Sequence, residues 1–207
     1  MSAAGKVCTG FSHPYIAKYS ASSGTVSYSE GMRLARGVEV SIEPTSSGDN
    51  QFFADNAVAE TESGRFTGGD LTLTVDGLFM AAEQMITGSP EPEEVNCGEG
   101  KNVKILKHGA KSDPPYFGFG YIARYMSDDA ITYVPTILRK IRFDTPKSAA
   151  KTSEASINFQ AQELTAKIAR DDSAGHDWKW VAEDQASEEE AEAILKVLLS
   201  VTEGGQV

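Results

Sequence analysis

The densest group of side chains that could bind a metal or carry out acid–base chemistry is Asp171, Asp172, His176 and Asp177. Carboxylates and an imidazole in one short segment are ligand types that cations use. The residues between them are Ser, Ala and Gly, which are typical of a tight turn between strands. We interpret the segment as a hairpin loop, and a cation site is the alternative.

No other arrangement in the chain predicts catalysis. The three histidines, His13, His108 and His176, are scattered, and none has a partner at the spacing of a metal site. The sequence contains no nucleophile elbow, no P-loop and no Cys/His arrangement. Cys8 and Cys97 are too few for a disulfide framework, so we expect free thiols, and a single bridge between them is the alternative. These observations predict a protein that is not an enzyme, with no catalytic residue, metal or cofactor.

Two aromatic segments have both a structural and a ligand-binding interpretation. Gly118-Phe119-Gly120 is similar to part of a dinucleotide-binding loop, but it lies inside an aromatic strand and does not open a helix. Its glycines then allow another segment to pack closely on the strand. Trp178 and Trp180 alternate along a short strand, which predicts packing against the sheet. The alternative for this pair is stacking on a ligand such as a sugar ring.

The charge is strongly negative and unevenly distributed. The 207 residues carry a formal net charge of −11, with five Lys/Arg against 14 Asp/Glu in residues 1–100 and 14 against 16 in residues 101–207. Tight nucleic-acid binding depends on Lys and Arg neutralising phosphates, so this composition argues against it. Residues 1–8 have no apolar signal region, and no apolar run approaches a membrane span. We therefore expect a cytosolic protein, or one released by lysis, with no membrane partner.

Two segments alternate between apolar and polar residues with a period of two. Residues 38–43 place Val38, Val40 and Ile42 on one side, and residues 70–76 do the same with Leu71 and Leu73. This period predicts strands with one buried face and one wet face. Neither polar row contains Lys or Arg, so the wet face is predicted to be smooth and anionic.

Strand signals dominate the rest of the chain. Strands are predicted over residues 15–19, 25–29, 37–46, 51–54, 58–66, 70–76, 103–108, 116–126, 131–143, 154–170 and 178–181. A short helix is predicted over 78–86, a loop over 87–102, and a second helix over 187–200 with Ser187 as its N-cap. Its apolar stripe is Ala191, Ile194, Leu195 and Leu198, and Glu188, Glu189, Glu192 and Lys196 are expected to be exposed. The chain is predicted to be one domain over 1–207, with a possible division into β-rich halves 1–100 and 101–207.

The order of these segments along the chain resembles that of a known protein family. It includes YIA at 15–17, GVEVSIE at 37–43, CGEG at 97–100, PYFGFGYI at 115–122 and ITYVPTILRKIRF at 131–143, then a Pro/Lys/Ser turn and a strand over 156–168. In this order the chain resembles the major tail (tail tube) proteins of long-tailed bacteriophages, the siphophages. The resemblance covers most of the chain and involves no catalytic residues.

The resemblance implies a mainly β (α+β) fold, a β-sandwich or barrel with flanking helices whose long hairpin strands form a barrel between subunits. It implies a structural virion protein that assembles, six to a ring, into a tail tube for the genome. The implied partners are further copies of the chain, a tape measure protein and a tail terminator, with DNA passing unbound. The implied location is the virion tail, after assembly in the host cytoplasm.

Alternation and the absence of basic residues predict which side chains would line the lumen of such a tube. The predicted lumen residues are Glu39, Ser41, Glu43, Thr72, Thr74, Asn158, Gln160 and Gln162. The apolar residues predicted to face the core are Val38, Val40, Ile42, Leu71, Leu73, Val75, Ile157 and Phe159. The alternative function is a β-sandwich carbohydrate-binding module, using Trp178 and Trp180, or a tail-associated adhesion protein.

Overall fold

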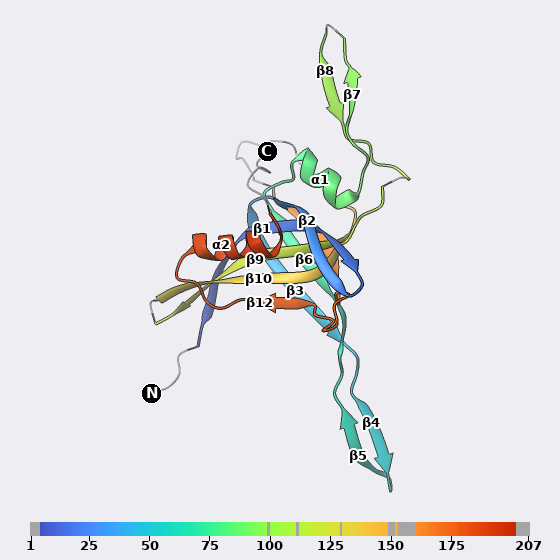
Figure 1. The fold of residues 1–207 in the computed structure, drawn as a ribbon, viewed down its shortest axis with the longest axis vertical. Coiled ribbons are helices and arrows are strands. Elements are labelled where there is room, and N and C mark those ends of the chain that lie inside the picture. Colours follow the sequence, from blue (N-terminus) through green and yellow to red (C-terminus); the bar gives the residue numbers. More distant parts are fainter. Residues whose placement is uncertain are drawn as a thin grey trace.

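The computed structural model describes residues 5–98, 100–110, 112–128, 130–148, 152 and 160–201. Within them the chain forms twelve strands and two helices, so the mainly β class predicted from the sequence is confirmed. Eight strands make one antiparallel sheet in the order β2-β1-β9-β10-β11-β6-β3, and β12 pairs with part of β10 (Figure 1). The bounds are β1 Val7–Ser22, β2 Thr25–Arg33, β3 Gly37–Ser46, β6 Phe66–Val75, β9 Phe117–Ser127, β10 Ala130–Phe143, β11 Gln162–Ala169 and β12 Lys179–Val181.

The order of the strands mixes the two halves of the sequence. The pairs β2–β1 and β6–β3 come from residues 1–100, and they flank β9, β10 and β11 from the second half. The contacts β1–β9 and β11–β6 are therefore long-range pairings within one sheet. The two β-rich halves do not form separate sheets.

The sheet bends around its principal core. Inward-facing apolar side chains from β9, β10, β11 and β6 meet there, and Phe117, Phe119 and Leu73 are fully buried. The bend brings β3 back to β1, where Gly37 lies directly against the ring of Phe11. At this position any side chain would collide with the ring, so the edge strand β3 can approach β1 only because residue 37 is glycine.

Helix α1 (Met80–Thr87) closes one end of this core with Ala82 and Ile86. It ends at Gly88, which adopts a left-handed conformation with φ 62°. The short helix predicted over 78–86 is confirmed, with its bounds shifted to Met80–Thr87.

Helix α2 (Glu188–Leu198) packs on the opposite face of β9 and β10. The Ser187 hydroxyl accepts a hydrogen bond from the Glu190 amide at 3.2 Å, which confirms the predicted N-cap. Ala191, Leu195 and Leu199 are buried against the sheet, whereas Ile194 and Leu198 are half-buried. A side chain at Gly120 would come within 2.8 Å of Leu199 and 3.1 Å of Leu195. Gly118 and Gly120 therefore form the flat surface on which α2 sits, as their placement within a strand predicted.

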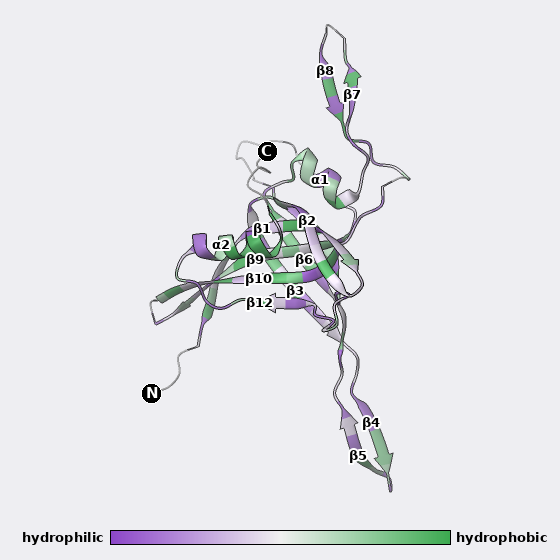
Figure 2. Cartoon of the chain, viewed as in Figure 1, coloured by the Kyte–Doolittle hydropathy of each residue, from purple (hydrophilic) through white to green (hydrophobic). Residues whose placement is uncertain are grey.

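Two hairpins project from the sheet in opposite directions along the long axis of the molecule. One is β4 (Asn50–Ala54) with β5 (Ala57–Glu62), and the other is β7 (Glu93–Asn96) with β8 (Asn102–Ile105). Every residue of these four strands is exposed. Apolar segments occur on both hairpins as well as in the centre of the sheet (Figure 2).

Several predicted boundaries need correction. Residues 87–102 were predicted to be a loop, but they contain β7 and lead into β8. The predicted strand over 154–170 is a strand only from Gln162 to Ala169, and residues 153–159 lie outside the described residues. No helix in the described part of the chain is both long and apolar enough to cross a membrane.

We predict that α2 stabilises its own subunit. Leu195→Ala would remove a fully buried side chain from the α2–sheet contact and lower the free energy of unfolding by about 2–5 kcal/mol. Chemical denaturation of the unassembled chain measures this loss. The matched control is Val197→Ala on the same helix, which is 78% exposed and is expected to change stability by less than about 0.5 kcal/mol. Equal stability of the two variants would contradict the prediction.

Candidate functional site

The outer face of β3, β6 and β11 is a polar surface built from three strands in register. Glu39 pairs with Thr74, Ser41 with Thr72, and Glu43 with Asp70. Directly paired residues on neighbouring strands project to the same side of a sheet. The three strands therefore present one continuous polar face, while Leu71, Leu73 and Val75 point into the core.

Strand β11 extends each of these rows by one residue. Glu163 pairs with Thr74, Thr165 with Thr72, and Lys167 with Asp70. We call the nine residues the polar face: Glu39, Ser41, Glu43, Asp70, Thr72, Thr74, Glu163, Thr165 and Lys167. Neither of the two helices in the described residues covers it, because α2 packs against the part of the sheet formed by β9 and β10 and α1 closes one end of the core.

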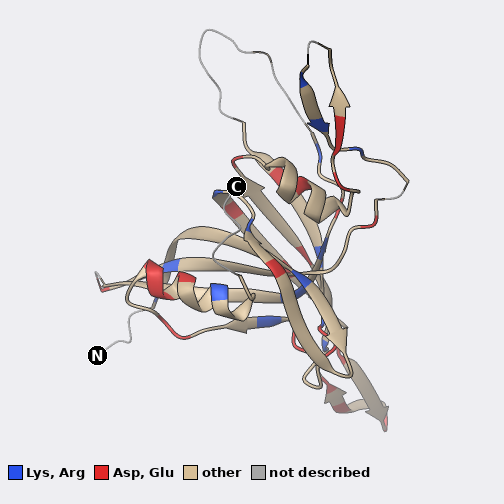
Figure 3. Cartoon of the chain, turned by 45° about the horizontal axis from the view of Figure 1, so that its top comes forward, with Lys and Arg blue, Asp and Glu red and all other residues tan. Residues whose placement is uncertain are grey.

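The polar face is acidic but not free of basic residues. Its four carboxylates, on Glu39, Glu43, Asp70 and Glu163, outnumber its one ammonium group, on Lys167. Lys167 donates a hydrogen bond to Asp70, and this contact raises the pKa of the lysine. In Figure 3 acidic and basic segments are interspersed over the sheet. The prediction of a face without Lys or Arg is correct for β3 and β6 and wrong for β11.

The structure brings together five of the eight residues predicted for the lumen: Glu39, Ser41, Glu43, Thr72 and Thr74. Gln162 pairs with Val75, so it lies on the core side, and its side-chain oxygen accepts a hydrogen bond from the Leu78 amide at 3.3 Å. The placement of Gln162 on the polar face is therefore wrong. Gln160 is exposed but lies before the start of β11, and Asn158 lies outside the described residues.

The phase of the alternation explains this error. In β11 the even-numbered residues Leu164, Ala166 and Ile168 are buried, so the odd-numbered residues face outward. The polar residues 158, 160 and 162 are even-numbered and cannot share a face with Glu163 and its outward neighbours in one regular strand. Val38 is a second correction: it was predicted to face the core and is 60% exposed near the start of the edge strand β3. Ile157 and Phe159 lie outside the described residues.

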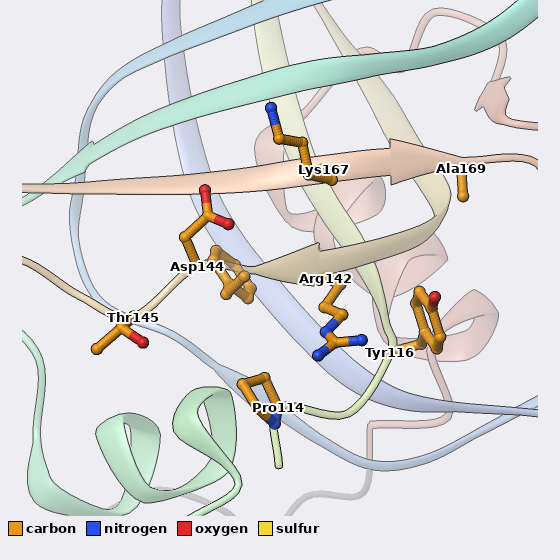
Figure 4. Close-up of a pocket in the computed structure, with 8 residues that line it drawn as sticks. Pro114, Tyr116, Arg142, Asp144, Thr145, Lys167 and Ala169 are labelled. Carbon is orange, nitrogen blue, oxygen red and sulfur yellow. The ribbon is translucent and has the colours of Figure 1, made fainter. Parts of the chain in front are cut away.

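A shallow cavity of about 570 Å³ lies at one end of the polar face, lined by residues that include Arg142 and Lys167. Figure 4 shows the Arg142 guanidinium pointing towards Pro114 and Tyr116, whereas the Lys167 amine points away from it. Asp144 also lines the cavity and accepts a hydrogen bond from the Thr165 hydroxyl at 2.8 Å. The two cationic groups do not converge, so this cavity does not have the geometry of an anion site.

The cluster at residues 171–177 forms a turn whose carboxylates bond to the protein itself. Asp171 is buried and accepts hydrogen bonds from Arg139 at 2.9 Å and from the Ser173 hydroxyl at 2.6 Å. Burial raises the pKa of Asp171, but the hydrogen bonds from Ser173 and Arg139 outweigh it and hold the pKa below its usual value. Asp172 pairs with Lys140 at 2.6 Å.

The last carboxylate of this turn, on Asp177, accepts a hydrogen bond from the Trp180 indole at 2.9 Å. The turn interpretation therefore accounts for all three carboxylates of the cluster. Among the described residues, no three His, Cys, Asp or Glu side chains are arranged to hold a metal.

The two tryptophans are both occupied by protein contacts. Trp178 stacks on Phe66 with ring centroids 4.6 Å apart and nearly parallel planes. The Arg139 guanidinium lies 3.6 Å from the ring centre of Trp180, where it forms a cation–π contact. These rings do not form the open aromatic pair on which a sugar could stack.

His13 is the histidine most involved in packing, which the sequence did not indicate. It has a left-handed backbone (φ 53°) where the β1 register shifts, and it faces α2. Its Nδ1 lies 3.1 Å from Glu188 and its Nε2 lies 3.9 Å from Glu192. Glu188, Glu192 and Lys196 are half-buried, contrary to prediction, whereas Glu189 is exposed as predicted. Glu192 accepts a hydrogen bond from the Tyr15 hydroxyl at 2.5 Å. Burial raises the pKa of Glu192, but hydrogen bonds from Tyr15 and Lys196 outweigh it and lower the pKa.

Comparison with known proteins does not assign this chain. No model of a protein family matches the sequence, and no curated protein matches it. The function proposed for the chain therefore rests on its own geometry and on the resemblance of its sequence to tail tube proteins.

We predict that Asp171→Asn destabilises the fold by about 3–5 kcal/mol at neutral pH, because it leaves the Arg139 guanidinium buried without its anion. The pKa of Asp171 is lowered by folding, so its stabilising contribution exists above the unfolded pKa of about 3.9 and is lost as the pH falls. Urea denaturation from pH 7 to pH 3 should therefore show a weaker loss of stability in acid for the variant.

Asp113→Asn is the control for this substitution. Asp113 is 94% exposed and lies 4.0 Å from Arg142, so its pairing contributes little. If both variants followed the wild-type pH dependence, the role assigned to the Arg139–Asp171 pair would be wrong.

Proposed function

We propose that this chain is a structural protein that assembles into rings, and that stacked rings form a bacteriophage tail tube with the polar face lining the channel. The observation that carries this proposal is the combination of an uncovered polar face with two fully exposed hairpins that project in opposite directions. The resemblance to siphophage tail tube proteins points the same way. In that setting the assembling copies would also meet a tape measure protein and a tail terminator.

The polar face suits the wall of a channel through which DNA moves. A duplex that must slide needs a surface to which its phosphates do not bind, and phosphate affinity comes from Lys and Arg. The polar face holds four carboxylates and a single lysine that is already paired with Asp70. Its remaining side chains are Ser41, Thr72, Thr74 and Thr165, which are small and uncharged. Salt screens charges over about 8 Å, so the repulsion would act only close to the wall.

The edges of the sheet favour closure with further copies. The sheet ends at β2 on one side and at β3 on the other, and β3 is a strand of ten residues. Long exposed edges are an aggregation risk that proteins limit by pairing or closure. A head-to-tail contact that closes on itself makes a ring and removes such edges.

The hairpins support the same conclusion. They expose large apolar side chains, of which Phe52 is the most exposed at 65%. A two-stranded hairpin is only marginally stable in water unless it packs against another structure. Exposed apolar side chains on a projecting element are typical of contact surfaces between proteins. No specific observation favours the carbohydrate-binding alternative, because Trp178 and Trp180 are occupied by Phe66 and Arg139.

Microscopy of the purified chain tests the proposal directly. Negative-stain images are expected to show rings or tubes, and sedimentation should show species much larger than the 22.2 kDa monomer. A chain that stays monomeric at high concentration under all salt conditions would contradict the proposal.

Charge reversal tests the lumen placement. Glu39→Lys combined with Glu43→Lys should leave tube assembly intact, because both residues are exposed and neither has an ion-pair partner among the described residues. Virions carrying the double variant should eject their genome more slowly, because the new lysines would bind phosphates of the passing duplex. The rate of DNA release on triggering is the measurement.

Glu183→Lys with Glu189→Lys is the matched control, since both residues are exposed and lie outside the polar face, just before α2 and in its first turn. It is expected to eject at the wild-type rate. Loss of rings in the Glu39/Glu43 variant, with intact rings in the control, would place the polar face at a subunit contact instead.

A further inference from the structure

An apolar row crosses the outer end of the three central strands. Val7 on β1 pairs with Met126 on β9, and Met126 pairs with Ile131 on β10. Residues paired in this way project to one side, so the three side chains form a continuous stripe. All three are exposed, Val7 at 63% and Met126 at 43%. We call this stripe the apolar tip.

One hairpin carries a matching surface. Val95 pairs with Val103 in the β7–β8 hairpin, and Ile105 lies two residues further along the same side. All three are exposed, and we call this side the hairpin face. The opposite side of the hairpin is polar, with Glu94 paired to Lys104. The β4–β5 hairpin differs, because its neighbouring residues Phe52 and Phe53 project to opposite sides and cannot both contact one surface.

The two surfaces also carry opposite charges. Arg124 lies two residues before Met126 and shares its side of β9, and it forms no ion pair with any described carboxylate. Glu93 lies opposite Ile105 on the hairpin face, and its pairing with Lys107 is between two exposed groups and contributes little. Each surface therefore combines three apolar side chains with a charged group, Arg124 at the apolar tip and Glu93 on the hairpin face, and these two groups are of opposite sign although Glu93 also contacts Lys107.

These two surfaces lie on different sides of one molecule. The apolar tip is at the end of the sheet near the N-terminus, and the β7–β8 hairpin projects from the far side (Figures 1 and 3). They cannot meet within a single chain, but they can meet between two copies in a head-to-tail arrangement.

We propose that the hairpin face of one copy packs on the apolar tip of the next copy, with Glu93 next to Arg124. This inference rests on the proposed function and identifies one pair of surfaces that would join its subunits. The contact is heterologous, so each copy still offers one free tip and one free hairpin, and association continues beyond a dimer.

The two native cysteines test this contact in the unmodified chain. Cys8 follows Val7 at the apolar tip, and Cys97 lies two residues beyond Val95 at the end of the hairpin, and both are exposed. A short bismaleimide added to the assembled protein is expected to join Cys8 of one copy to Cys97 of the next. Because the contact is head-to-tail, the product on a denaturing gel should be a ladder of dimers, trimers and higher species. Peptide mass spectrometry identifies the joined residues, and Cys8→Ser or Cys97→Ser should each abolish the ladder.

Matched variants distinguish the loss of this contact from a general effect of placing a charge at an exposed apolar position. Met126→Glu should abolish the ladder, whereas Val197→Glu, at an exposed apolar position on α2, should leave it unchanged. Arg124→Glu and Glu93→Arg should each weaken the ladder, and the double variant should restore it.

The failures of the two proposals are distinguishable. Rings without a Cys8–Cys97 product, Cys8–Cys8 or Cys97–Cys97 dimers alone, or normal assembly of Met126→Glu would overturn the proposed contact while leaving ring formation intact. A chain that forms no rings and no ladder would overturn both proposals.

Discussion

The central strands β9 and β10 are buried on both faces, and the rest of the structure is arranged around that constraint. On one side Phe117, Phe119 and Leu138 enter the principal core, and on the other side Ile122 and Ile137 lie under α2. A strand pair covered on both sides has to be apolar throughout, except where a polar group is fully paired. Arg139 is a charged residue of this kind, buried next to Trp180 and paired with Asp171. The smaller polar residue Thr136 is also buried on β10. The Arg139–Asp171 ion pair connects β10 to the turn that leads to β12 and then to α2.

From β9 and β10 towards the edge strand β3, fewer faces of each strand are covered by other parts of the chain. The buried residues of β11 and β6 lie on the core side, and β3 at the edge has no buried residue, with Gly37, Val40 and Ile42 half-buried. The outer face of these three strands is therefore free for another role, and its composition is restricted by solvent more than by packing. The two hairpins extend this trend, because they have no cover on either side. Burial thus falls from the centre of the molecule to its projections, and the surfaces proposed for assembly are those that packing within one chain leaves open.

The sequence predicted those parts of the fold in which each local signal had one physical cause. Alternation in β3 and β6 reflects burial on one side, so the face of Glu39, Ser41 and Thr72 was predicted correctly. The same signal failed at β11, because polar residues before the strand continue the alternation in the opposite phase. Strand β7 was predicted to be part of a loop, because the Pro, Gly and Glu content of residues 87–102 is typical of loops and the strand has no buried side to produce a pattern, whereas β8 falls largely within the strand predicted over 103–108. The contact of His13 with α2 joins residues about 175 positions apart, and no local pattern indicates such a pairing.

The exposed hairpins also have a kinetic consequence. Fixing the backbone of a residue costs about 1–2 kcal/mol in conformational entropy, and a hairpin with no packed side recovers little of that cost within its own chain. A partner that orders a hairpin must supply this free energy, so the first encounter between two free copies is the least favourable one. In the proposed assembly, a copy that joins an existing end, where several neighbours order its hairpins together, would gain more contacts for the same ordering cost. Such a chain would remain dispersed at low concentration and extend an existing end in preference to starting a new one, so that an initiating complex would set both where growth begins and how many assemblies form.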